Sequence, residues 1–167
     1  MRYFVLFVLP VMAIFLQSTL FGFYNINGVV PDLVLIFVIF FALFNGAEKG
    51  AVYGYLCGLL EDLFLGRFVG FNALSKALTA YIAGRLQGNV FKENIMVGAL
   101  GVFLATILNG LFLFLLSFIG PIFLNIDFNM LKMLLLQSLY NLFLAVPVYI
   151  WYYNASNSGV LRHGGER

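Results

Sequence analysis

Charge is the scarcest property of this sequence. Of its 167 residues, 10% are charged and 63% are apolar, whereas a soluble domain has about 25% charged and about 45–50% apolar residues. Nine basic and seven acidic side chains are too few to cover a water-facing globule of this length. The composition therefore excludes a soluble enzyme. The net charge of +2 is too small to indicate a polyanionic partner, so we expect no nucleic-acid binding.

Cysteine and histidine are almost absent as well. The single Cys57 excludes both an intrachain disulfide and a multi-cysteine metal site. The one histidine, His163, lies in the polar C-terminal segment, which argues against a histidine-based metal or acid–base centre. The sequence also lacks GxSxG, HExxH, CxxC and phosphate-loop motifs. We therefore expect no catalytic residues, no metal and no cofactor.

Long apolar runs are what the sequence has in abundance. A membrane-spanning helix needs about 20 apolar residues, and the runs predict an all-α polytopic membrane protein with six transmembrane helices. Residues 1–167 then form a single integral membrane domain that ends in a polar cytoplasmic tail at 154–167. The third and fourth runs contain charged residues, so a re-entrant pair is the alternative there. The six runs cover roughly 3–22, 29–45, 50–66, 70–87, 95–119 and 130–153.

The distribution of lysine and arginine predicts the orientation. Short cytoplasmic loops are rich in these residues, and a cytoplasmic N-terminus places six of them inside and two outside. We therefore expect both termini in the cytoplasm. The inner six are Arg2, Lys49, Arg85, Lys92, Arg162 and Arg167, and the outer two are Arg67 and Lys132. Aromatic residues near the end of the last run would form an interfacial belt on the inner side: Tyr149, Trp151, Tyr152 and Tyr153.

A glycine ridge is the sharpest pattern in the third run. Gly50, Gly54 and Gly58 recur every fourth residue, and the same ridge continues to Asp62 and Gly66. Such spacing removes side chains from one helix face, so that a neighbouring backbone can approach closely. Two interpretations are open, namely packing within the chain and docking of another protein's transmembrane helix.

Three charges interrupt the apolar runs at similar depths. Glu61 and Asp62 lie about 6–8 Å and Lys76 roughly 9 Å from the predicted turn between the third and fourth runs, by helix rise. An unpaired charge near the bilayer centre costs about 2.5–3.5 kcal/mol or more. We therefore expect Lys76 to pair with Glu61 or Asp62 and to stabilise the hairpin, while a proton relay is the less favoured alternative.

Other polar residues are scattered over the apolar runs. Pro31 suits a first helical turn, and Asp32 complements the positive end of the helix dipole at the start of the second run. The remaining side chains predict hydrogen bonds between helices, each contributing about 0.6–2 kcal/mol; lining of a small-molecule cavity is the alternative. They are Gln17, Ser18, Thr106, Asn109, Gln137, Ser138 and Asn141.

The stretch from Pro31 to Leu86 resembles the rod shape-determining protein MreD family. The resemblance rests on the Pro31-Asp32 pair before the second run and on the glycine-spaced third run. It rests further on an Asp followed by Gly-x-x-x-Gly-x-Asn-Ala-Leu. In this sequence the residues of that motif are Asp62, Gly66, Gly70, Asn72, Ala73 and Leu74.

The resemblance implies a non-enzymatic scaffold of the bacterial cell-elongation machinery in the inner membrane. The partner it implies is MreC and, through MreC, MreB filaments, a SEDS glycosyltransferase and a class B penicillin-binding protein. It also implies a fold resembling the substrate-binding components of energy-coupling-factor transporters. A substrate-binding component of such a small-molecule transporter is therefore the alternative function. Those components typically carry Ala-x-x-x-Ala on the first helix, whereas here Gln17 follows Ala13 at that spacing.

Overall fold

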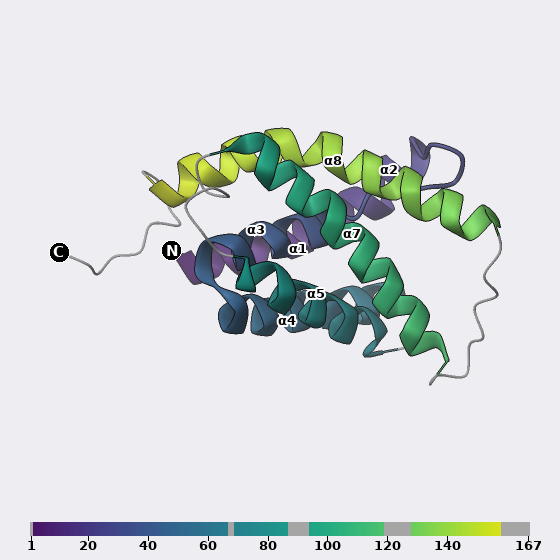
Figure 1. Cartoon of the computed structure of the whole chain (residues 1–167), viewed down its shortest axis with the longest axis horizontal. Helices are drawn as coiled ribbons and strands as arrows, with labels where there is room; N and C mark the ends of the chain where they lie inside the picture. The colour runs from purple at the N-terminus through teal and green to yellow at the C-terminus, as the bar shows by residue number, and fades with distance from the viewer. Residues whose placement is uncertain (1, 67–68, 87–93, 119–127, 158–167) are drawn as a thin grey trace.

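The computed structural model describes residues 2–66, 69–86, 94–118 and 128–157, and in these ranges the regular elements are all helices (Figure 1). The predicted all-α class is thereby confirmed. Six helices have 13 residues or more, and a seventh, α2, has four. The helices are α1 (Arg2–Ser18), α2 (Leu20–Phe23), α3 (Leu33–Asn45), α4 (Ala47–Leu65), α5 (Phe71–Arg85), α7 (Ile95–Ser117) and α8 (Phe128–Asn157).

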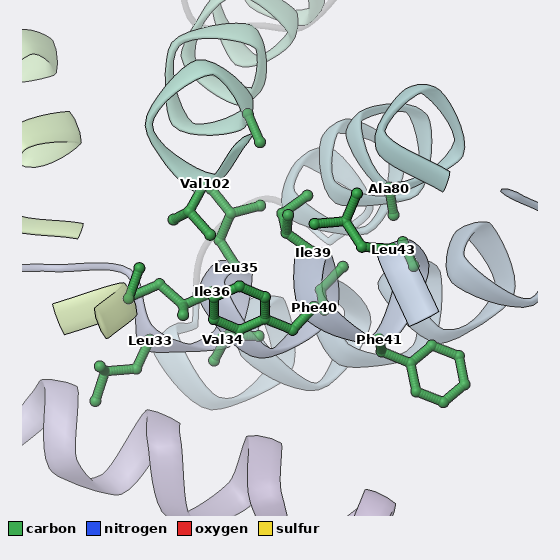
Figure 2. Close-up of a cluster of buried hydrophobic side chains, with 14 of the residues drawn as sticks. Leu33, Val34, Leu35, Ile36, Ile39, Phe40, Phe41, Leu43, Ala80 and Val102 are labelled. Carbon is green, nitrogen blue, oxygen red and sulfur yellow. The ribbon is translucent and has the colours of Figure 1, made fainter. Parts of the chain in front are cut away.

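Helix α3 forms the centre of the bundle. Ten of its 13 residues are buried, as expected for a helix that is apolar on all sides. Figure 2 shows its side chains reaching toward Val102 on α7 and toward Ala80 on α5. The five other long helices contact α3, and the start of α1 and the end of α8 lie at the same end of the molecule (Figure 1).

Three helical stretches are long and apolar enough to cross a bilayer by length and composition. They are Phe4–Phe23, Ile95–Ser117 and Asn129–Ala155. Helix α3 has 13 residues and is about 20 Å long, shorter than a hydrocarbon core of about 30 Å. Helices α4 and α5 contain the charges that weaken their hydropathy. The part of the chain that the structure describes thus identifies a membrane protein with three candidate spans, and crossings by α3, α4 and α5 stay a prediction.

The residues just before α3 lie inside the bundle but are not helical. A helix was expected from residue 29, but α3 begins at Leu33, and the buried Pro31 precedes the N-cap Asp32 instead of occupying the first turn. At the other end of the chain, α8 continues to Asn157, so the first residues of the expected tail at 154–167 are helical. The remainder of that tail lies outside the described residues.

Two of the expected belt residues face inward. Tyr149 and Tyr152 are 5% and 3% exposed. Their rings pack against Phe40 and Phe44 of α3, with centroid separations of 5.6 Å and 5.2 Å. These aromatic residues therefore belong largely to the core, while Trp151 is exposed.

The glycine ridge packs against helices of the same chain. A Cβ atom on Gly54 would lie 2.8 Å from the carbonyl oxygen of Lys76 on α5, and one on Gly50 would lie 2.5 Å from Cβ of Ala42 on α3. At Gly58 the nearest atoms are again α5 backbone. The ridge ends there, because nothing lies within 4 Å of such an atom on Gly66, whose φ of +60° instead serves the left-handed C-cap of α4.

We predict that Gly58→Ala destabilises the protein. The added methyl would lie 2.7 Å from Cα of Ala73 and 2.6 Å from the carbonyl carbon of Asn72, so α4 and α5 would have to separate. Overpacking of this kind costs about 1–3 kcal/mol, which should lower the Tm in detergent. Gly22→Ala is the matched control, because the nearest atom to its new methyl is 3.7 Å away. Equal Tm values for the two variants would contradict close packing of α4 on α5.

Candidate functional site

An ion cluster lies where α3, α4 and α5 meet. The Lys76 side chain on α5 is fully buried, and its Nζ atom lies 2.7 Å from Oδ2 of Asp32 and 2.8 Å from Oε2 of Glu61. The contact with Asp32 is a hydrogen bond. The contact with Glu61 is an ion pair without hydrogen-bond alignment, since Oε2 lacks a hydrogen-bond partner among the described residues. We call Asp32, Glu61 and Lys76 the ionic cluster.

Gln17 connects α1 to this cluster. Its Nε2 donates to Oε1 of Glu61 at 3.3 Å, and its Oε1 accepts a hydrogen bond from the backbone N–H of Val34 at 3.0 Å. One amide therefore bridges α4 and the first turn of α3. Interhelical bonding by Gln17 follows the sequence expectation, although the sequence alone did not identify its partners.

Asn141 and Gln137 connect α8 to the start of α3. Oδ1 of Asn141 accepts a hydrogen bond from the backbone N–H of Asp32 at 2.9 Å, and Gln137 donates to the carbonyl oxygen of Val30 at 3.0 Å. Asn141 also donates to Oγ1 of Thr106 on α7 at 3.0 Å. With these residues the ionic cluster reaches all six of the longer helices. The polar core is defined as Gln17, Asp32, Glu61, Lys76, Thr106, Gln137 and Asn141.

The other polar side chains in the apolar runs have more local roles. Ser18 and Ser138 donate to carbonyl oxygens of their own helices. Asn109 is buried, and its Oδ1 has no hydrogen-bond partner among the described residues. These residues do not extend the polar core.

Asp62 caps α5 instead of pairing with Lys76. Its Oδ2 accepts hydrogen bonds from the backbone N–H groups of Gly70 at 2.8 Å and Ala73 at 3.2 Å. Its Oδ1 accepts from the backbone of Asn72 at 3.3 Å and from its side chain at 2.8 Å. The first N–H groups of a helix lack intrahelical partners and favour a negative charge. Of the two partners expected for Lys76, Glu61 is confirmed and Asp62 is wrong, because the Asp62 carboxylate already accepts four hydrogen bonds at the start of α5.

The residues of the family-like motif fall into two sites. Asp62, Gly70 and Asn72 form the α5 cap, whose spacing accounts for the Asp-to-Asn pattern in the sequence. Asp32, next to Pro31, belongs to the ionic cluster and also caps α3, where its Oδ1 accepts from the N–H of Leu35 at 2.8 Å.

The second partner of Lys76 was missed in the sequence. Asp32 precedes Lys76 by 44 residues, and its position before a helix already explained it as a cap. A count of the acidic and basic residues in the apolar runs could have indicated that Asp32 also needs a cation. Pairing Lys76 with one acid of the hairpin leaves Asp32 as an uncompensated buried charge, which is expensive in a membrane interior.

The ionic cluster links α3, α4 and α5 through non-covalent ion pairs. Its one ammonium group contacts both carboxylates, which also bond to surrounding amides, and each of the three residues is less than a tenth exposed. Within the described residues no group of three or more His, Cys, Asp or Glu side chains is placed to hold a metal. The arrangement is suited to holding helices in register.

The family model for the rod shape-determining protein MreD matches residues 1–156. The chain belongs to the MreD family. It is therefore a rod shape-determining membrane protein, consistent with its apolar helices. No curated protein and no solved structure matches the chain, and a likeness to energy-coupling-factor transporters is accordingly not shown.

We predict that Lys76→Met strongly destabilises this MreD-family protein. The variant removes the cation and leaves two buried carboxylates facing each other, and breaking a buried ion pair costs about 3–5 kcal/mol. Thermal unfolding in detergent should show a large loss of Tm. Lys132→Met, the same change at an exposed position of α8, should have little effect.

Neutralising the carboxylates tests the cause of that loss. The triple variant Asp32→Asn, Glu61→Gln and Lys76→Met carries no unpaired charge and should recover part of the Tm lost by Lys76→Met alone. A single variant as stable as the unaltered protein would contradict the cross-linking role of the cluster.

Proposed function

We propose that the protein is a non-enzymatic scaffold of the cell-elongation machinery in the bacterial inner membrane. It would organise peptidoglycan synthesis by binding MreC and, through MreC, MreB filaments, a SEDS glycosyltransferase and a class B penicillin-binding protein. The observation that carries this proposal is the family match over residues 1–156.

The use of the charged side chains supports a scaffold over an enzyme. Lys76 is paired with both Asp32 and Glu61, and Asp62 accepts hydrogen bonds from backbone and amide donors. An ammonium between two carboxylates has no lone pair for nucleophilic attack. These contacts bind helices to each other and leave large apolar side chains on the outside, including Phe143 on α8 and Leu104 on α7. Such surfaces suit lipids and partner helices.

The runner-up function, a substrate-binding transporter component, gains no support from α1. Ala13 is buried, and Gln17, at the position of the second alanine of the Ala-x-x-x-Ala pattern, bonds to Glu61 and Val34 inside the bundle. This face of α1 is therefore engaged within the chain. The scaffold is the function we propose.

We predict six membrane crossings with both termini in the cytoplasm. The Lys/Arg asymmetry favours this orientation, and it agrees with the common end shared by the start of α1 and the end of α8 (Figure 1). Reporter fusions at Asn27 and after the C-terminus should report periplasmic and cytoplasmic locations respectively. A periplasmic C-terminus would contradict an even number of crossings.

The scaffold proposal predicts recovery of MreC with the protein. A tagged full-length chain that replaces the resident copy in its own host should restore rod shape and co-purify MreC from detergent-solubilised membranes. The Lys132→Met chain should do the same, whereas cells with Lys76→Met should become rounded because less folded protein accumulates.

Two results would contradict the proposal. One is turnover of lipid-linked cell-wall precursor by the purified chain alone. The other is the recovery of transporter ATPase subunits in place of MreC, which would favour the transporter alternative.

A further inference from the structure

A groove between α1 and α4 lies outside the polar core. It has a volume of about 680 Å³, within the size range of small-molecule sites. Its walls are apolar side chains, with Leu6 and Phe7 on α1 and Val52, Leu56 and Leu60 on α4. One end is lined by the exposed charged residues Glu48 and Lys49, at the start of α4.

Hydrogen bonds between the two helices define the shape of the groove. Pro10 has no N–H, so the carbonyl oxygen of Leu6 lacks its usual helical donor. The hydroxyl of Tyr53 donates to that oxygen at 2.9 Å, and the Tyr53 ring packs on Phe41 with centroids 4.4 Å apart. Farther along, Gln17 of α1 bonds to Glu61 of α4. The helices are therefore held together along the floor and at the far end of the groove.

The length of the groove matches one leaflet of a bilayer. From Lys49 to Leu60 the helix rises by about 16 Å, roughly half of a hydrocarbon core of about 30 Å. A partner's transmembrane helix would require a groove along the whole core. A lipid acyl chain, in contrast, occupies one leaflet and begins at the headgroup level, which is where the predicted crossings place the short connection with Glu48 and Lys49.

The charged end provides the selectivity that the apolar walls lack. Lipid tails are as apolar as leucine, so the walls by themselves do not favour a bound lipid over the surrounding bilayer. Glu48 and Lys49 present one negative and one positive charge, the complement of an ammonium and a phosphate. We propose that the groove between α1 and α4 binds one acyl chain of a zwitterionic phospholipid, with its phosphate at Lys49 and its ammonium at Glu48.

Native mass spectrometry of the purified full-length chain tests this site. The protein is incubated with equal amounts of phosphatidylethanolamine and phosphatidylglycerol that carry the same acyl chains. We expect one retained phosphatidylethanolamine. Val52→Trp and Leu56→Trp fill the groove and should abolish retention. Leu63→Trp is the matched control, because Leu63 is as exposed on α4 as Val52 (62% and 63%) but lies outside the groove.

A charge variant tests the headgroup assignment separately. Glu48→Gln removes the partner of the ammonium, so the preference should shift toward phosphatidylglycerol while the groove remains occupied. Thermal unfolding of each variant verifies that it is folded. Retention of lipid by both folded groove variants, or an equal loss with Leu63→Trp, would overturn the site. Equal retention of the two lipids by the unaltered chain would overturn the assignment to a zwitterionic headgroup.

Discussion

The start of α3 lies inside the bundle, and its backbone must be hydrogen-bonded there. Irregular backbone at membrane depth is tolerated only where the protein itself satisfies it. Here the partners are side chains: Gln137 bonds to the carbonyl of Val30, Asn141 to the N–H of Asp32 and Gln17 to the N–H of Val34. Asp32 caps the helix itself. The polar residues of α1 and α8 are thus needed because the central helix α3 is short and its first backbone groups require hydrogen-bond partners.

The ionic cluster connects the buried start of α3 to α4 and α5. Asp32 is charged and buried, so it needs a cation, and Lys76 supplies it while also binding Glu61. Replacing a buried ion pair by apolar groups is often neutral or stabilising, so net stability is a poor explanation for the cluster. Its directional contacts instead define how α3, α4 and α5 are aligned. A bundle aligned in this way, with apolar side chains outside, suits the scaffold role that we propose.

Close backbone packing and polar cross-linking act at the same helix pair. Transmembrane helices gain no hydrophobic energy by associating, so small residues and hydrogen bonds must hold them together. The glycines of α4 bring its backbone against α5, and Asp62 joins the same two helices by capping α5. The α4–α5 pair is also the most extensive helix contact in the described chain. The cap and the close packing together explain why glycines and an aspartate occur in one run.

The sequence by itself determined the helical class, the membrane environment, the helix-packing glycines and the family, because these depend on composition and local spacing. It also indicated that Lys76 needs a carboxylate. Only the tertiary structure decided which carboxylates bind Lys76. Asp62 caps α5 instead, while Asp32, 44 residues away in sequence, contacts Lys76 together with Glu61. The inward orientation of Tyr149 and the late start of α3 could not be inferred from the sequence either. Pairing across helices depends on how faces meet in space, and helical periodicity along one segment does not specify that.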